Sequence, residues 1–327
     1  MSDMTRHHVV VLAGGLSHER EVSLRSGRRV AEAMSDAGVE ATVRDVDPDL
    51  MRWLRSERPE CVLPLLHGAT GEDGSLREIL ELASVPYVGS TPGAARLAFD
   101  KPIAKQVLRQ AGVQTPASVT LPADTFREVG AAVVMAALVD RLGLPLFVKP
   151  AQGGSALGGS AVHGADELPA AMVACFAYGP VALVEKLITG VEVSVPVLDT
   201  VDGPRALLPV EIRPASGVYD YTARYTAGAT EFVVPPELSS GAVDACGRAA
   251  LTAHNVLGLR DLSRSDLIVD GAGTVWFLEV NVAPGMTETS LVPLSIEESG
   301  LDLGQTCAEL CQCAVARASV GDGAPKP

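Results

Sequence analysis

The first 66 residues alternate between short apolar stretches and longer stretches of mixed polarity. Residues 9–12, 41–46 and 61–66 are typical of buried strands, and residues 21–37 and 50–55 between them are predicted to be helices. Strands that alternate with helices in this way form a parallel sheet with helices packed on its faces. The sequence therefore predicts an α/β fold in which ligands bind at the carboxyl ends of the strands.

Two polar loops lie at those carboxyl ends, residues 14–19 after the first strand and residues 67–74 after the third. The first loop lacks the Gly-x-Gly-x-x-Gly spacing that dinucleotide sites require, which argues against an NAD-dependent oxidoreductase. Glu19 stands at the mouth of this loop. It is suited to bind an ammonium group, or only to complement the positive end of the following helix.

The chain changes character after residue 93. Two helices and two short strands are predicted there, over residues 101–110, 126–142, 146–148 and 181–185. Residues 152–160 are too rich in glycine for a helix and lack the P-loop motif, but such glycines allow backbone N–H groups to surround a phosphate. Lys101 and Lys149, which taken singly are typical of solvated surface, are placed to add positive charge to that loop.

Residues 185–188 end one of these strands and precede Gly190 and Glu192. A strand end and its connector can bind adenine through backbone hydrogen bonds, while a carboxylate holds the ribose hydroxyls. A routine charged hairpin end is the alternative interpretation of this segment.

The last part of the chain is predicted to contain four strands, over residues 191–198, 207–212, 266–269 and 274–280. Pro196 predicts that the first of them is an edge strand, because proline cannot donate a hydrogen bond to a neighbour. Residues 213–236 lack a clear period. A long irregular segment of this kind is usually a functional lid or a disordered loop.

Oxygen-bearing side chains gather near the end of the last predicted strand. Glu279 and Asn281 are two residues apart and share one face. Asp266 begins the preceding strand, which the turn at residues 270–273 predicts to be an antiparallel neighbour. Carboxylate and amide oxygens are ligands that suit Mg²⁺ together with phosphate. The alternative, the solvent side of an ordinary strand, loses weight because the chain also carries the glycine-rich loop and paired lysines.

Composition limits the possible partners and compartment. The net charge of −14 argues against a nucleic-acid-binding surface, which needs clustered Lys and Arg. No apolar run is long enough to span a membrane, and the N-terminus lacks the plan of a signal peptide, so we expect a cytoplasmic protein. The six cysteines are scattered or lie on the predicted last helix, and we interpret them as small buried hydrophobic residues.

Six motifs occur in one order along the chain. They are Gly-Gly-x-Ser-x-Glu-x-Glu-Val-Ser-Leu (14–24), His-Gly-x-x-Gly-Glu-Asp-Gly (67–74), Asp-Lys (100–101), Val-Lys-Pro (148–150), Tyr-Asp-Tyr-x-Ala-x-Tyr (219–225) and Glu-x-Asn-x-x-Pro-Gly-Met-Thr (279–287). In this combination the chain resembles the D-alanine–D-alanine ligases of the ATP-grasp superfamily from about residue 9 to residue 314.

The resemblance implies an ATP-grasp fold of class α/β (α+β) with an N-terminal parallel α/β domain. The expected parts are an N-terminal domain (1–92), a central subdomain (93–186), a C-terminal subdomain (187–318) with a lid at 213–236, and a disordered tail (319–327). The implied reaction transfers the γ-phosphoryl group of ATP to one D-alanine, and the amine of a second D-alanine attacks the resulting acyl phosphate, for peptidoglycan synthesis. Two Mg²⁺ ions per site, replaceable by Mn²⁺, and a homodimer are further implications.

The resemblance also implies roles for individual residues. Glu19 would hold the ammonium of the first D-alanine, joined by hydrogen bonds to Ser155 and to Tyr225 of the lid. The other substrate contacts would come from His67, Arg264, Gly285, Ser290 and Leu291, with Arg264 and the N–H of Gly285 stabilising the oxyanion. ATP would be held by Lys101, Lys149, Gly154, Ser155, Glu185, Lys186, Ile188, Glu192 and Arg224. The metal ligands would be Asp266, Glu279 and Asn281.

Three residues depart from the family pattern: Arg224 replaces a usual lysine, Ala156 a usual serine and Ser265 a usual apolar residue. Arginine contacts phosphate but its planar fork is not interchangeable with an ammonium. Tyr225 favours a dipeptide product over a depsipeptide. The alternatives are a biosynthetic or resistance paralogue that joins D-alanine to D-serine or D-lactate, and a nucleotide-binding regulator that keeps the fold without turnover.

Overall fold

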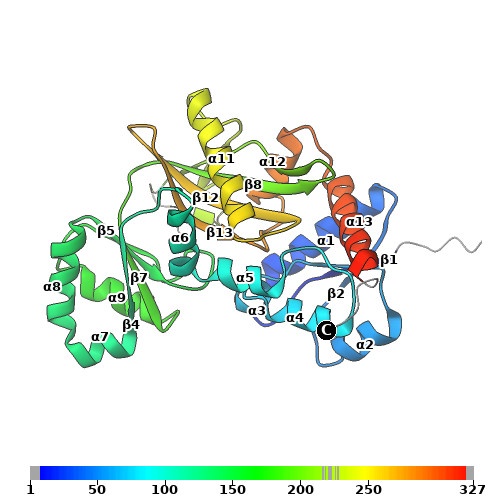
Figure 1. Cartoon of the computed structure of the whole chain (residues 1–327), viewed down its shortest axis with the longest axis horizontal. Helices are drawn as coiled ribbons and strands as arrows, with labels where there is room; N and C mark the ends of the chain where they lie inside the picture. The colour runs from blue at the N-terminus through cyan, green and yellow to red at the C-terminus, as the bar shows by residue number, and fades with distance from the viewer. Residues whose placement is uncertain are drawn as a thin grey trace, which may run out of the picture.

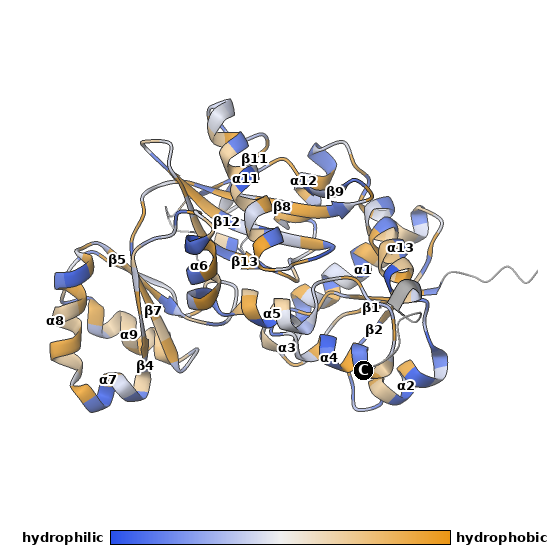
Figure 2. Ribbon diagram, viewed as in Figure 1, coloured by the Kyte–Doolittle hydropathy of each residue, from blue (hydrophilic) through white to orange (hydrophobic). Residues whose placement is uncertain are grey.

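The structure is a computed structural model that describes residues 8–321 apart from residues 216, 218, 220–222, 225 and 227. Within these residues the chain forms three sheets, which are arranged side by side along the long axis of the molecule (Figure 1). Figure 2 shows hydrophobic residues along β8 and β12 at the centre, and hydrophilic residues on the outer sides of α2, α4 and α6.

The first sheet is parallel and has the order β2-β1-β3. Its strands are β1 (His8–Leu12), β2 (Glu40–Arg44) and β3 (Cys61–Pro64), joined by α1 (Arg20–Asp36) and α2 (Leu50–Glu57). Short helices α3 (Ala69–Glu72) and α4 (Ser75–Ala83) follow β3. The parallel α/β arrangement predicted from the alternating pattern is therefore confirmed.

The last helix, α13 (Leu303–Gly321), returns to this first sheet and packs against α1 and β3 (Figure 1). Cys61, Cys307 and Cys311 lie together in the resulting core as buried free thiols, as expected for small hydrophobic residues. The predicted disordered tail at 319–327 begins too early, because α13 continues to residue 321. Residues 322–327 lie outside the described part of the chain.

The second sheet is antiparallel, with the order β4-β7-β5-β6. It contains β4 (Ser118–Pro122), β5 (Leu146–Pro150), β6 (Ser160–Val162) and β7 (Val181–Lys186). The covering helices are α7 (Ala123–Val129), α8 (Ala131–Leu142) and α9 (Leu168–Phe176). The single helix predicted over 126–142 is two helices, because Gly130 adopts φ = 102°, a conformation that glycine allows and that interrupts the helical path.

The third sheet has the order β11-β10-β8-β12-β13, with β9 paired to β8. Its strands are β8 (Gly190–Thr200), β9 (Gly203–Ala206), β10 (Val210–Pro214), β11 (Thr230–Val233), β12 (Leu262–Asp270) and β13 (Val275–Asn281). Helix α11 (Ser240–Val256) covers this sheet, and α12 (Leu291–Glu298) follows it. Part of the segment expected to be an irregular lid is thus a strand, since β11 pairs with β10.

Helices α5 (Pro92–Phe99) and α6 (Lys101–Gln110) also pack in the core of the third sheet, together with α11. The sequence assigned residues from 93 onward to the central unit, which holds the second sheet. Small alanines at positions 94, 95 and 98 let α5 lie close to β13, so this part of the chain belongs structurally to the third sheet.

Pro196 lies in the interior of the third sheet, so the edge-strand prediction is wrong. Strand β8 pairs with β12 on one side and with β10 and β9 on the other. The carbonyl of Pro196 accepts from the N–H of Leu207, between the end of β9 and the start of β10. Pro196 therefore lies where the neighbour of β8 changes from β9 to β10. Its missing N–H costs no hydrogen bond between paired strands at this point.

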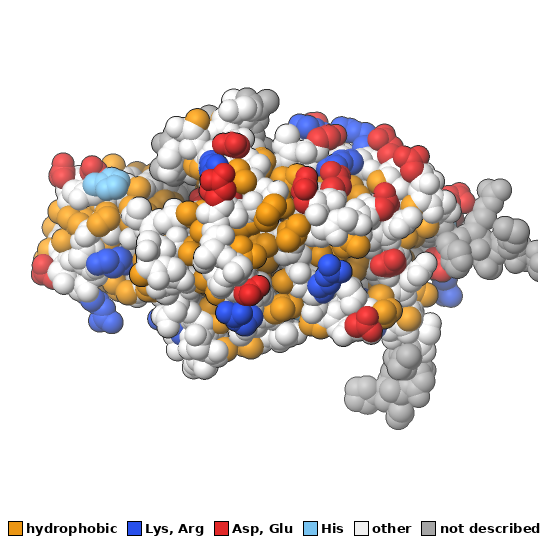
Figure 3. Space-filling view, turned by 90° about the horizontal axis from the view of Figure 1, so that it is seen from above, with side chains coloured by type: hydrophobic (Ala, Val, Ile, Leu, Met, Phe, Trp, Pro, Cys, Tyr) orange, Lys and Arg blue, Asp and Glu red, His pale blue; other side chains and the backbone are white. Residues whose placement is uncertain are grey.

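The distribution of surface charge and the length of the helices bear on possible partners. On the face shown in Figure 3, acidic and basic side chains are interspersed over the described residues rather than gathered by sign. Within the described ranges, none of the helices combines the length and the apolar character needed to cross a bilayer.

An ion pair between a buried carboxylate and a partly exposed guanidinium fixes α13 to the rest of the molecule. Asp261 is fully buried, and its two oxygens accept from Arg317 at 2.7 and 2.6 Å, while the N–H of Gly89 donates to Oδ2 at 2.7 Å. Arg317→Leu is expected to lower the free energy of unfolding by about 2–3 kcal/mol, since the carboxylate stays buried with less compensation.

Denaturation in urea measures this change. Arg52→Leu is the matched control, because Arg52 pairs with Asp49 across an exposed helix surface, with side chains 85% and 68% accessible. We expect a change below about 0.5 kcal/mol there. Equal effects of the two substitutions would contradict the anchoring role of Arg317.

Candidate active site

Two adjoining cavities lie where the three sheets meet. The smaller has a volume of about 100 Å³ and the larger about 370 Å³. Six residues line both: Lys101, Gly153, Gly154, Tyr219, Arg224 and Glu279. The two cavities therefore open onto one another at a cluster of charged groups.

The structure brings all the described residues that the sequence singled out to these cavities. The small cavity is also lined by Glu19, His67, Ser155, Arg264, Asn281, Gly285, Ser290 and Leu291. The large cavity is also lined by Lys149, Glu185, Lys186, Ile188, Glu192 and Asp266. Tyr225 lies outside the described residues, so its predicted contact with Glu19 stays a prediction.

Glu19 and Ser155 connect the first sheet to the glycine-rich loop. Glu19 precedes α1, and the Ser155 hydroxyl donates to its carboxylate. Ser155 and Ala156 adopt φ values of 54° and 56°, which non-glycine residues rarely do. Backbone strain of this kind persists where the surroundings impose it, often at functional sites. Here it turns the Ser155 hydroxyl toward the small cavity.

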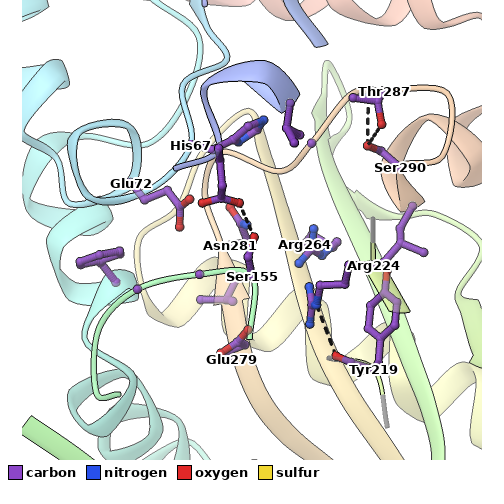
Figure 4. Close-up of a pocket in the computed structure, with 18 of the residues that line it drawn as sticks. His67, Glu72, Ser155, Tyr219, Arg224, Arg264, Glu279, Asn281, Thr287 and Ser290 are labelled. Carbon is purple, nitrogen blue, oxygen red and sulfur yellow. Dashed lines mark hydrogen bonds between the residues drawn. The ribbon is translucent and has the colours of Figure 1, made fainter. Parts of the chain in front are cut away.

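His67 and Glu72 lie on the side of the small cavity opposite Arg264, Arg224 and Tyr219 (Figure 4). His67 Nδ1 lies 3.0 Å from the carbonyl oxygen of Ala283, so this nitrogen is the donor, and buried Nε2 has no hydrogen-bond partner among the described residues. Burial lowers the pKa of His67. The ring is therefore neutral and offers an acceptor.

Glu72 is a cavity residue that the sequence analysis did not single out. Its carboxylate accepts from the N–H of Gly68 at 2.9 Å. Burial and then the negative charge of Glu19 raise the pKa of Glu72 to about 7. The available signal was its place in the motif at 67–74, which by itself does not distinguish a site residue from a turn residue.

Gly285 and Ser290 form the end of the small cavity next to α12. The Ser290 hydroxyl accepts from the N–H of Thr287 at 2.9 Å, and the two hydroxyls are also 2.9 Å apart. A Cβ at Gly285 would lie 2.9 Å from Ser290 Oγ, so a larger residue would displace that hydroxyl. Thr287 and Thr289, to which the sequence analysis gave no role, line the same wall.

The predicted β12–β13 hairpin is present and places Asp266 directly opposite Glu279. Arg264 bonds both oxygens of Asp266, at 2.9 and 2.8 Å, and Ser194 donates to Oδ1 at 2.8 Å. Burial alone would lower the pKa of Arg264, but the charge and hydrogen bonds of Asp266, together with the charges of Tyr219 and Glu279, outweigh burial and raise the pKa, so the guanidinium stays charged. Asn281 Oδ1 accepts from the N–H of Ala283 at 2.7 Å.

Negative and positive groups are balanced around Glu279. Burial alone would raise its pKa, but two lysines and two arginines outweigh burial and lower the pKa to about 2. These cations are Lys101, Lys149, Arg224 and Arg264. On β8, the pKa of Glu192 is raised to about 7, first by burial and then by the charges of Asp266 and Glu279, against the opposing charges of Arg224 and Lys149.

The donor chemistry of these strands fits a divalent cation that is completed by a ligand. Within the described ranges, no three His, Cys, Asp or Glu side chains are close enough to enclose a metal by themselves. Asp266 and Glu279 nevertheless face one another across adjacent strands, with Asn281 beside them. Magnesium is commonly bound by one or two carboxylates together with phosphate oxygens and water, and such a set matches this arrangement.

The large cavity runs from the charged cluster to the end of β7. Lys101 Nζ donates to the carbonyl of Gly153 at 2.6 Å, and Lys149 Nζ lies 2.8 Å from Glu185 Oε1. The guanidinium carbon of Arg224 lies 4.3 Å from the ring centre of Tyr219, and these two residues of the expected lid line both cavities. Cations at one end and the connector at 186–188 at the other suit an elongated anion with a flat, hydrogen-bonding end.

Comparisons with known proteins agree along nearly the whole chain. Residues 107–312 match the model for the D-Ala–D-Ala ligase C-terminus, and residues 54–90 match the model for the N-terminus. The chain is similar to the D-alanine–D-alanine ligase of Anaeromyxobacter dehalogenans, at 39% identity over 97% of this chain and 100% of that protein. Its similarity to that of Stutzerimonas stutzeri is 40% over 91% of each chain.

Solved structures show the same architecture. The D-alanine–D-alanine ligase of Bacillus anthracis, solved in complex with ATP, has a TM-score of 0.79 at 26% identity, covering 96% of this chain and 99% of that one. The VanG D-Ala:D-Ser ligase of Enterococcus faecalis has a TM-score of 0.78 at 28% identity, covering 95% and 100%. The ATP-grasp fold expected from the sequence is thereby confirmed.

Proposed function

The chain belongs to the D-alanine–D-alanine ligase family, and from this premise we propose how its two cavities divide an ATP-dependent ligation. The enzyme joins two D-alanine molecules into D-alanyl-D-alanine with release of ADP and phosphate. We assign ATP to the large cavity and the two D-alanines to the small one. The proposal rests chiefly on the cluster shared by both cavities, at which Lys101, Arg224 and Glu279 meet.

In the first step, a carboxylate oxygen of one D-alanine attacks the γ-phosphorus of ATP, and the bond to the β-γ bridging oxygen breaks. Phosphoryl transfer depends mainly on positioning and charge stabilisation. Lys101, Lys149 and Arg224 supply positive charge, and the backbone of Gly154 with the Ser155 hydroxyl lies beside the phosphates. The products of this step are D-alanyl phosphate and ADP.

In the second step, the neutral amine of the other D-alanine attacks the carbonyl carbon of D-alanyl phosphate. The bond from that carbon to the phosphate oxygen breaks, and the leaving phosphate keeps the bonding electrons and takes up the proton that the amine nitrogen loses. Glu19 holds the ammonium of the first D-alanine, and His67 lies beside that substrate. Arg264 and the N–H of Gly285 donate to the oxyanion, where preorganised donors lower a barrier most. Ser290 and the N–H of Leu291 hold the carboxylate of the second D-alanine.

The base and ribose of ATP lie at the far end of the large cavity. Glu185, Lys186 and Ile188 bind the adenine, and Glu192 is assigned to the ribose hydroxyls. Asp266, Glu279 and Asn281 would hold Mg²⁺, two ions per site with Mn²⁺ as a substitute. Bound metal supplies charge neutralisation of the phosphate oxygens. Closure of the lid keeps water from the acyl phosphate.

The wider setting is also part of the proposal. We infer a cytoplasmic homodimer that supplies peptidoglycan precursors. We also propose the three units 1–92, 93–186 and 187–318. One sheet in each range supports this division, although α5 and α6 pack on the third sheet and α13 on the first.

Product identification tests the assignment. The protein is incubated with ATP, Mg²⁺ and equal amounts of D-alanine, D-serine and D-lactate, and the products are separated by mass spectrometry. We expect D-alanyl-D-alanine as the main product and phosphate release that requires D-alanine. A mixed product with D-serine would favour a paralogue of the kind that the VanG D-Ala:D-Ser ligase represents, and one with D-lactate a depsipeptide-forming paralogue. Nucleotide binding without phosphate release would indicate a regulator.

Ser155→Ala is expected to lower kcat/KM for D-alanine by about 10–100-fold, because a hydrogen bond to a charged group is worth roughly 1.5–3 kcal/mol. Glu19 would lose the donor that fixes its carboxylate. Initial rates at saturating ATP measure the effect. Ser160→Ala is the matched control, since Ser160 begins β6 and lines neither cavity. A Ser155→Ala enzyme as active as the control would reject the positioning role of Ser155.

A further inference from the structure

Lys105 is a buried lysine that lines neither cavity. It lies on α6 one turn after Lys101, and its side chain is fully buried. Its ammonium donates to Oε2 of Glu185, which lies 80 residues later in the chain on β7. Neither the motifs nor the family-derived roles of the sequence analysis assign any part to Lys105.

Two lysines enclose the Glu185 carboxylate. Lys105 binds Oε2 from behind the cavity wall, and Lys149 lies 2.8 Å from Oε1 on the cavity side. Burial alone would raise the pKa of Glu185, but the charges of Lys105 and Lys149 lower it. Glu185 therefore stays ionised although it is almost wholly buried. An ionised carboxylate accepts hydrogen bonds and donates none.

The two carboxylate oxygens of Glu185 differ in the hydrogen bonds that they already accept. Oε2 is taken by Lys105. Oε1 is paired in charge with Lys149, but within the described residues no group donates to it with hydrogen-bond geometry. A buried acceptor without a donor is costly, so Oε1 is suited to a ligand donor. Glu185 is one of the residues that line the large cavity, beside the connector at 186–188, where the base of the nucleotide is assigned.

We propose that Lys105 is a positioning residue: it holds Glu185 by Oε2, so that Oε1 accepts a hydrogen bond from the exocyclic amino group of the base. Lys105 thereby sets the preference of the nucleotide site for a 6-amino purine over a 6-oxo purine. The inference rests on the proposed ATP site. A 6-oxo group presents an acceptor to an acceptor, which leaves Oε1 unsatisfied and repelled. Without Lys105, Glu185 keeps only Lys149 and turns toward the phosphate side of the cavity.

The experiment compares ATP with ITP, which differ at the 6-position, in full-length wild-type enzyme and in Lys105→Met. We expect KM for ATP to rise about tenfold with little change in kcat, and the ratio of kcat/KM for ATP to that for ITP to fall about tenfold, which corresponds to ~1.4 kcal/mol. Lys105→Gln retains a donor but not the charge, so its ratio is expected to lie between the two. It also serves as the second variant if the methionine form does not fold.

Arg109→Met is the matched control, because Arg109 lies one turn later on α6 and lines neither cavity. Its ATP-to-ITP ratio is expected to equal that of the wild type. If the Lys105 variants lose activity equally with ATP and ITP, or lose only thermal stability, Lys105 is structural and the inference is overturned. Failure of the proposed function is distinct, since the wild type itself would then form no product with ATP.

Discussion

Glu279→Gln is expected to lower kcat by about a thousandfold or more, equivalent to at least ~4 kcal/mol of transition-state stabilisation. Glu279 lies in both cavities, directly across from Asp266. Its charge faces four cations, with Lys101 Nζ at 3.6 Å. Glutamine keeps the shape of the side chain and removes its charge. The site would therefore lose a charged ligand of the proposed metal and the negative charge that compensates these four cations.

Two measurements separate these causes from misfolding. Mn²⁺ binding in the presence of ATP, followed by electron paramagnetic resonance, is expected to weaken in the Glu279→Gln enzyme, while thermal unfolding stays cooperative. Glu211→Gln is the control, because Glu211 is a buried glutamate of the same sheet that lines neither cavity. Turnover of Glu279→Gln close to that of the control would contradict the assignment of Glu279 to the metal.

The β12–β13 hairpin shows what local sequence patterns determine. The turn at residues 270–273 and the two-residue period predicted that these strands are antiparallel neighbours, and they are. Regular pairing from Val269 and Val275 would place Asp266 opposite Leu278. A register shift between Asp266 and Leu267, which the sequence did not show, brings Asp266 opposite Glu279 instead. Asp270 supports the turn by accepting from the N–H groups of Ala272 and Thr274. Period and turn chemistry are local properties, and the sequence is sufficient for them.

Contacts between segments that are distant in the sequence could not be predicted from local patterns. Lys105 and Glu185 each resemble an ordinary surface charge in the sequence, and only the folded chain shows them buried against one another. Pro196 was assigned to an edge because the sequence does not show that β8 changes partners at that residue. The return of α13 to the first sheet depends on which hydrophobic faces are complementary, which periodicity does not encode.

The roles of the site residues depended on family resemblance rather than on pattern. Taken alone, Glu19 is better explained as a charge that complements the N-terminus of the following helix, and only the family resemblance favoured a role in substrate binding. Its contact with Ser155 from the glycine-rich loop agrees with the expected link between them. Glu72 shows the converse, since its raised pKa arises from burial next to Glu19 in the folded molecule.

Arg264→Met is expected to lower kcat/KM for D-alanine by about a thousandfold, because removal of one oxyanion donor costs about 10²–10³ and Asp266 also loses its orienting partner. Arg264 is buried, lines the small cavity and binds both oxygens of Asp266. Arg264→Lys keeps the charge but replaces the planar fork with a single ammonium, so we expect a smaller loss, of about 10²-fold.

Steady-state rates with varied D-alanine and a separate measurement of ATP binding distinguish the roles of Arg264. If Arg264 is a catalytic donor to the oxyanion, its loss lowers kcat while ATP still binds. If Arg264 is purely structural, its loss lowers kcat and weakens ATP binding together, because the fold is destabilised. Arg264→Met also leaves the Asp266 carboxylate buried with Ser194 as its remaining donor, so thermal stability should fall. The two variants therefore test different points. A folded Arg264→Met enzyme with wild-type kcat would remove Arg264 from the chemistry and leave the oxyanion to the N–H of Gly285 alone, and wild-type kcat in Arg264→Lys would contradict the need for the planar fork.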